Sequence, residues 1–268
     1  MYIMSGPNFA PSTQNFSQPE TAEYDTSSDQ LVVQFLSGLA ANNGFGEYAT
    51  QATSSTFNGL RIPREQLESA IATAERAFDI PGVRDTNAGL VEAGDWQTFA
   101  HQAREAVLVA LMTHEEKAAI AAGIHDAGKA KATIQAVINK PKGQDLTPED
   151  RLVLEDHPID SERRARAAGI TDPLVLFLVG THHQAIIPDP ERNARPYGTF
   201  AAPPNERAGW LGQVFAACDY FDARVNVRVY QDNPLAAGAV VDAMPQQLAV
   251  PGEVIDLFRA RLEIPVAV

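Results

Sequence analysis

Apolar residues recur at helical spacing along most of this sequence, whereas the alternation of apolar and polar residues that is typical of β-strands is nearly absent. Leu31 and Phe35, for example, fall on one face of a helix, and Thr147 followed by Pro148 is a strong signal for a helix start. We therefore expect an all-α fold. Helices are expected over residues 28–43, from 63, over 94–113 and 115–126, from 148, from 173, and over 206–229 and 251–262.

Composition and pattern divide the chain into four segments. Residues 1–28 are rich in Ser, Thr, Gln, Asn and Pro with almost no aliphatic side chains, so we expect a disordered or flexible arm. Residues 29–92 are expected to form a small helical N-terminal region and residues 93–232 the main functional domain. Residues 233–268 are expected to form a C-terminal helical extension.

The overall charge restricts the class of partner. The chain carries 34 Asp and Glu against 21 Lys and Arg, a formal net charge of -13. Long nucleic acids are bound largely through neutralisation of phosphates by basic side chains, so we do not expect such a partner. A small anionic substrate remains compatible with this charge if basic side chains gather locally at a site.

Cysteine usage and hydropathy indicate the compartment. The single cysteine, Cys218, excludes an internal disulfide, fits a reducing environment, and lies in an apolar helix where we expect a buried, inert thiol. No run of about 18 apolar residues is found, and the N-terminal composition does not favour a Sec-type leader, so we expect a soluble cytoplasmic protein without a membrane partner. The polar arm leaves a second interpretation open, namely a secretion signal of a translocated effector.

Histidines carry the strongest chemical signal. Five of the six histidines form an ordered series in which His125 is followed directly by Asp126, and His182 by His183. Imidazole and carboxylate together suit manganese, iron, cobalt, nickel or zinc. Helices can carry such ligands, because sites in bundle cores draw single side chains from several facing helices. The full candidate series is His101, His125, Asp126, His157, His182, His183 and Asp219.

This series resembles the HD superfamily of metal-dependent phosphohydrolases, and specifically its HD-GYP branch, over about residues 95–232. Residues 124–129, Ile-His-Asp-Ala-Gly-Lys, are similar to the HD-x-G-K signature, and residues 147–157 match the segment that places the next histidine. Residues 179–183, Val-Gly-Thr-His-His, resemble the paired histidines. Residues 215–223 are similar to the V-A-D-x-F-D-A helix of the branch. The resemblance implies an HD-domain helical bundle with a helical N-terminal extension.

The resemblance also implies two divalent transition-metal ions, with iron or manganese expected and zinc, nickel or cobalt compatible. A water or hydroxide between the two ions would attack a phosphodiester phosphorus, with Asp126 as the shared, catalytic carboxylate. The first ion would be held by His101, His125, Asp126 and Asp219, and the second by Asp126, His157, His182 and His183.

Basic and aromatic residues near this series are candidates for substrate binding. Lys129, three residues after Asp126, and Arg228 occupy positions where the branch places phosphate-binding bases. The resemblance also gives Lys129 a catalytic role, in which its charge offsets the charge that develops on the phosphate. Two departures from the pattern accompany them. Gln97 stands where some members carry a glutamate for a third ion, which favours two ions. The short G-Y-P loop is replaced by residues 186–200, in which Arg195 and Tyr197 are the substrate-binding candidates.

The expected function is therefore a phosphodiesterase that hydrolyses a cyclic dinucleotide such as c-di-GMP or cGAMP. The alternative that uses the same metals is a nucleotide phosphohydrolase or phosphatase acting on another phosphate ester. Two alternatives from other functional classes stay open, namely a di-iron oxygenase of HD type and a non-catalytic nucleotide-binding module. A homo-oligomer is compatible with the sequence.

Overall fold

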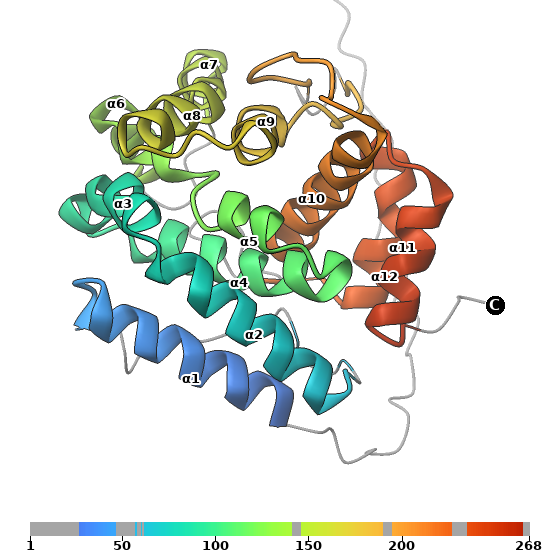
Figure 1. Ribbon diagram of the computed structural model, residues 1–268. Helices are drawn as coiled ribbons and strands as arrows, with labels where there is room; N and C mark the ends of the chain where they lie inside the picture. Colours follow the sequence, from blue (N-terminus) through green and yellow to red (C-terminus); the bar gives the residue numbers. More distant parts are fainter. Residues whose placement is uncertain are drawn as a thin grey trace, which may run out of the picture.

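The computed structural model describes residues 27–46, 57, 60, 62–140, 146–189, 195–226 and 235–264. These residues form an all-α fold, as predicted, and apart from one isolated antiparallel bridge between Ile186 and Leu248 they contain no β-structure (Figure 1). The α-helices are α1 Ser27–Asn42, α2 Arg64–Asp79, α3 Pro81–Ala93, α4 Trp96–Thr113, α5 Glu116–Ala122, α6 Ala132–Ile138, α7 Pro148–Glu155, α8 His157–Ala167, α9 Pro173–Thr181, α10 Glu206–Val225, α11 Ala237–Gln247 and α12 Gly252–Arg261. A short 3-10 helix, η2, spans Ala127–Ala130.

Helix α4 lies at the centre of the molecule and is covered by α2, α5, α10 and α12 (Figure 1). Every residue of α4 except Gln97 and Thr98 is buried, although the sequence pattern had indicated one inward face. A helix that is buried on all sides belongs to a core, and its polar residues then need a specific reason to be there. His101, Arg104 and Glu105 are such residues.

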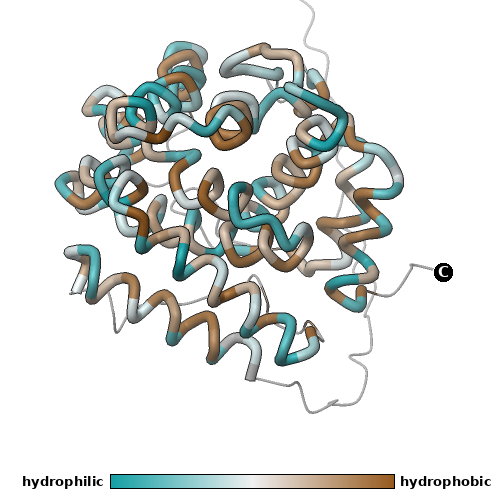
Figure 2. The backbone as a smooth tube through the Cα atoms, viewed as in Figure 1, coloured by the Kyte–Doolittle hydropathy of each residue, from teal (hydrophilic) through white to brown (hydrophobic). Residues whose placement is uncertain are grey.

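The N-terminal and C-terminal segments contribute to the same hydrophobic core as the central helices. The Phe99 ring of α4 lies 5.0 Å from the ring of Phe45 and 5.4 Å from that of Phe78. At the other end of the fold, the rings of Phe221 in α10 and Phe258 in α12 are 5.7 Å apart. Helix α1, which supplies part of this core, alternates hydrophilic and hydrophobic residues along its length (Figure 2). The expected division at residues 92 and 232 stays a prediction.

Several boundaries differ from the expected ones for local reasons. The helix expected over 115–126 ends at Ala122, and the chain then turns through Gly123 into η2, so that His125 and Asp126 lie in an irregular turn. The helix expected over 206–229 ends at Val225, with Asn226 extended, and residues 227–229 lie outside the described part. Helix α1 already begins at Ser27, and Ser28 is buried, so only residues 1–26 of the expected arm lie outside the described residues.

The predicted starts of α7 and α9 are confirmed, and in both a side chain caps the helix. Thr147 and Asp150 form a capping box at α7, and Asp172 accepts from the amides of Leu174 and Val175. Helices α3, α6 and α11 were not predicted. Among the described residues, no helix is both long and apolar enough to cross a membrane.

Candidate metal centre

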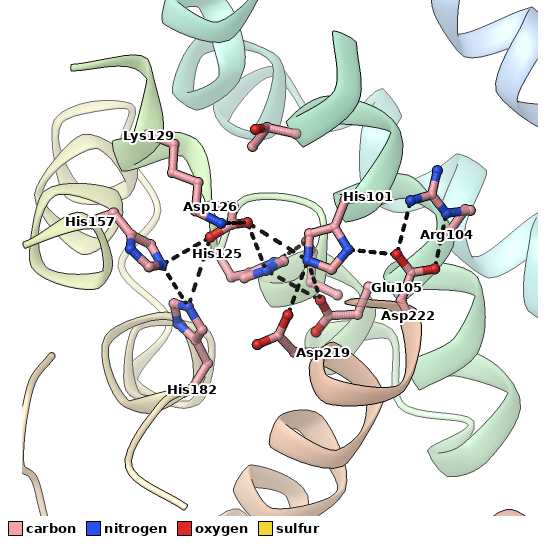
Figure 3. A network of polar contacts seen from close by, with 12 residues as sticks. His101, Arg104, Glu105, His125, Asp126, Lys129, His157, His182, Asp219 and Asp222 are labelled. Carbon is pink, nitrogen blue, oxygen red and sulfur yellow. Dashed lines mark hydrogen bonds and ion pairs between the residues drawn. The ribbon is translucent and has the colours of Figure 1, made fainter. Parts of the chain in front are cut away.

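The predicted ligands converge on one buried point from several elements that are far apart in the sequence (Figure 3). His101 comes from α4 and Asp219 from α10. His125 and Asp126 occupy the turn between α5 and η2, and His157 is the first residue of α8. His182 and His183 follow directly after α9. Helix ends and a tight turn thus direct five of the seven side chains, although His125 and Asp126 were expected within a helix over 115–126.

Three of the imidazole rings are oriented by backbone carbonyls of the preceding turn. Nδ1 of His125 lies 2.9 Å from the carbonyl oxygen of Ala122. Nδ1 of His157 and Nδ1 of His182 lie 2.7 Å from the carbonyl oxygens three residues before them. A carbonyl oxygen can only accept, so each Nδ1 donates to it and each ring turns its Nε2 atom to the centre. Metal-binding histidines are held in this way.

The fourth ring, His101, is oriented by a buried ion pair. Nδ1 of His101 donates to Oδ2 of Asp222 at 2.7 Å. The guanidinium of Arg104 donates to both Asp222 oxygens at 2.9 Å, and Asn226 donates to Oδ1 at 2.9 Å. Burial would raise the pKa of Asp222, but the Arg104 charge holds it well below its usual value, so the carboxylate stays ionised and His101 also turns its Nε2 atom to the centre.

Asp126 lies between two groups of ligands (Figure 3). Its Oδ1 atom is 3.0 Å from Nε2 of His157 and 3.9 Å from Nε2 of His182. Its Oδ2 atom is 3.5 Å from Nε2 of His125 and 3.7 Å from Nε2 of His101. The two oxygens of one carboxylate therefore face opposite sides of the cluster, which is the position of a carboxylate shared by two ions.

The side chains divide into overlapping groups that match the two expected ligand sets in large part. In each group the candidate ligand atoms all lie within 4.8 Å of one another. The groups are His101, Glu105, His125 and Asp219; His125, Asp126 and His182; and His157, His182 and His183. Nε2 of His157 and Nε2 of His182 lie 3.1 Å apart, at hydrogen-bonding distance, so both atoms point to the same spot.

The charge balance and the pKa directions fit bound cations. Burial lowers the pKa of His125 to about 4 and that of His183 to about 3, so the rings are neutral ligands at neutral pH. Four carboxyl groups, those of Glu105, Asp126, Asp219 and Asp222, face two basic side chains in this centre, Arg104 and Lys129. A surplus of buried carboxylates is costly unless positive charge is supplied. Among the described residues, Nε2 of His125 and Oδ1 of Asp126 also lack a hydrogen bond. The donor set therefore fits divalent ions.

The candidate substrate residues lie in different places. Nζ of Lys129 is 2.5 Å from Oδ2 of Asp126, with part of its side chain exposed at the edge of the centre. The Tyr197 ring stacks on that of His183 at 4.2 Å, next to the centre. Arg195 instead forms two hydrogen bonds with Glu155 of α7, at 2.9 and 2.5 Å. Arg228 lies outside the described residues.

No family model, curated protein or solved structure matches this chain. The geometry therefore has to carry the functional argument by itself.

Sequence reasoning missed Glu105 and the role of Asp222. Glu105 is fully buried in α4 one turn after His101, and the spacing of four residues on one helix was the available signal. Gln97 stands at the position where some members of the HD-GYP branch carry a glutamate for a third ion. It is an exposed residue in the first turn of the same helix. Cys218 is buried, and burial raises the pKa of its thiol well above the usual value, as expected for an inert cysteine.

Proposed function

We propose that this chain is a metal-dependent phosphohydrolase of the HD type that hydrolyses a phosphodiester, with a cyclic dinucleotide as its substrate. The observation that carries the proposal is the position of Asp126, whose two oxygens face one ligand group each. Two divalent ions bound in this way would supply an activated water nucleophile and would neutralise charge on the phosphate. Iron or manganese suits the mixed imidazole and carboxylate ligands.

The protein side chains divide the remaining work between them. Asp126 fixes the separation of the two ligand groups, and Asp222 keeps the His101 ring in its ligating orientation. Lys129 holds an ammonium group at the partly exposed edge of the centre, where a phosphate oxygen could replace one of its contacts with Asp126. Such a charge would stabilise the negative charge that develops on the non-bridging phosphate oxygens during attack.

Tyr197 supports a nucleotide as the carrier of that phosphate. Its ring is stacked on His183 and is edge-on to His157 at 5.9 Å. An aromatic face beside a phosphate-binding centre is suited to stacking on a nucleobase. The acidic net charge of -13 favours a small nucleotide over a long nucleic acid as the substrate.

The test is hydrolysis of cyclic dinucleotides, linear dinucleotides, nucleoside monophosphates and a generic aryl phosphate by the full chain loaded with Mn²⁺ or Fe²⁺. We expect turnover of a cyclic dinucleotide that is abolished by chelation and restored by adding back the metal. Activity confined to the other esters would support metal-dependent hydrolysis but would show that the substrate is not a cyclic dinucleotide, as for a phosphatase. Stoichiometric ion binding with no hydrolysis of any ester would contradict the proposal and would favour an oxygenase or a binding module.

A further inference from the structure

Glu105 carries a carboxylate that is buried in the core of the fold. It has no exposed surface, and its neighbours along α4 include the buried side chains of Ala106, Val107 and Leu108. Removing a carboxylate from water costs several kcal/mol unless a cation or strong hydrogen bonds compensate for it.

Glu105 faces the Nε2 atoms of two candidate ligand histidines. Oε2 of Glu105 is 3.2 Å from Nε2 of His125 and 3.6 Å from Nε2 of His101 (Figure 3). Both rings use Nδ1 for a hydrogen bond elsewhere, so both turn Nε2 toward the carboxylate. A divalent cation among these atoms would bind the carboxylate and both imidazoles at once.

Asp219 completes this group. Its Oδ1 atom lies 3.1 Å from Nε2 of His101, and the four ligand atoms of His101, Glu105, His125 and Asp219 all lie within 4.8 Å of one another. Two imidazoles and two carboxylates around one point form a sufficient ligand set for a divalent transition metal. On the opposite side of Asp126 the corresponding group contains three imidazoles, His157, His182 and His183.

We infer that Glu105 is a direct ligand of the ion held by His101, His125 and Asp219, so that the two ion positions differ in kind. The inference rests on the proposed two-ion centre and adds a ligand that the expected set did not contain. The Glu105 position is rich in carboxylate and favours a hard ion such as Mn²⁺. The opposite position is rich in imidazole and suits Fe²⁺, Co²⁺ or Zn²⁺.

The experiment is a titration of the metal-free full chain with Mn²⁺, in which the fall of the free-ion signal in electron paramagnetic resonance counts the bound ions. Wild type, Glu105→Gln and Glu105→Asp are compared, with Glu116→Gln on the exposed face of α5 as the matched control. In Glu105→Gln we expect the tighter Mn²⁺ site to weaken by more than the roughly 10–100-fold that is typical of residues that only support a ligand. Glu105→Asp should recover part of the affinity, and Glu116→Gln should titrate as wild type.

Thermal unfolding of the same metal-free proteins separates a ligand from a structural carboxylate. A fully buried carboxylate whose charge serves to bind metal carries a desolvation cost in the metal-free fold. Metal-free Glu105→Gln should therefore unfold at the same temperature as wild type or higher. A lower unfolding temperature together with unchanged Mn²⁺ binding would overturn the inference.

The outcome for Glu105 can be read separately from the outcome for the proposed function. Two ions bound to Glu105→Gln with wild-type affinity, and full hydrolysis, would remove Glu105 from the ligand set and would leave the phosphohydrolase intact. Two ions bound to wild type, one of them lost in Glu105→Gln, would establish the ligand even if no phosphate ester were hydrolysed.

Discussion

Replacing Asp126 with alanine is expected to lower kcat/KM for the phosphodiester substrate by about 1,000-fold or more, because two-metal catalysis supplies several kcal/mol of barrier reduction. Asp126 is the carboxylate that faces both ligand groups, 3.0 Å from Nε2 of His157 and 3.5 Å from Nε2 of His125. Its loss also leaves Lys129 without the carboxylate that it contacts at 2.5 Å. Both ions should therefore bind more weakly, and the carboxylate that the two ions would share is lost.

The measurement is steady-state hydrolysis together with the metal content of the same samples after dialysis. Asp126→Asn keeps the shape of the side chain and removes its charge, so it should reproduce most of the loss. Asp85→Ala, on an exposed position of α3, is the matched control and should behave as wild type. An Asp126→Ala protein that kept both ions and its turnover would contradict the shared position of this carboxylate.

Replacing Gly128 with alanine is expected to destabilise the metal-free fold by about 3 kcal/mol, the upper range for overpacking a close contact. A Cβ atom at Gly128 would lie 2.2 Å from the carbonyl oxygen of His157 and 2.8 Å from the amide nitrogen of Ser161. Both contacts are with backbone, so α8 would have to move away from η2 as a unit. The Gly128 amide also donates to Oγ of Ser161 at 2.8 Å, and that hydrogen bond would be strained.

The same displacement should affect the metal centre, since His157 is the first residue of α8 and Asp126 immediately precedes η2. Urea unfolding of the metal-free protein and the metal content after reconstitution measure the two effects. Gly38→Ala in α1 is the matched control, because its added methyl meets nothing within 4 Å. Alanine is favoured over glycine in helices by about 1 kcal/mol, so this variant should be as stable as wild type or more stable. Wild-type stability and metal content in Gly128→Ala would refute the steric account.

The candidate ligand set was predicted from the resemblance of short motifs to the HD-GYP branch, and the structure brings these side chains together. The motifs are local in sequence, since His125 and Asp126 lie close to Gly128, His157 precedes Pro158, and the paired histidines follow an apolar helix. The contacts that orient the ligands could not be predicted in this way. Asp222 meets Arg104 across 118 residues and His101 across 121 residues, and no local pattern indicates that pairing.

The helices that were missed share a weak local signal. Helix α3 contains Pro81, Gly82, Asn87 and Gly89, which are poor helix formers, and its buried Val83 and Leu90 are too few to give a clear period. It is stabilised by packing on α4, α8 and η2. Helix α6 has only seven residues, and α11 carries Pro245 within it. Tertiary packing thus determines the elements that propensity alone does not.

The central claim is that two ions sit on either side of Asp126, and anomalous diffraction from crystals of the full chain grown with Mn²⁺ tests it most directly. We predict two anomalous peaks separated by roughly 3.5–4 Å, the spacing that a shared carboxylate imposes. One peak should lie among His101, His125 and Asp219, and the other among His157, His182 and His183. Crystals soaked in saturating Mn²⁺ that showed no peak at this cluster, or a single peak that Asp126 does not contact, would contradict the account.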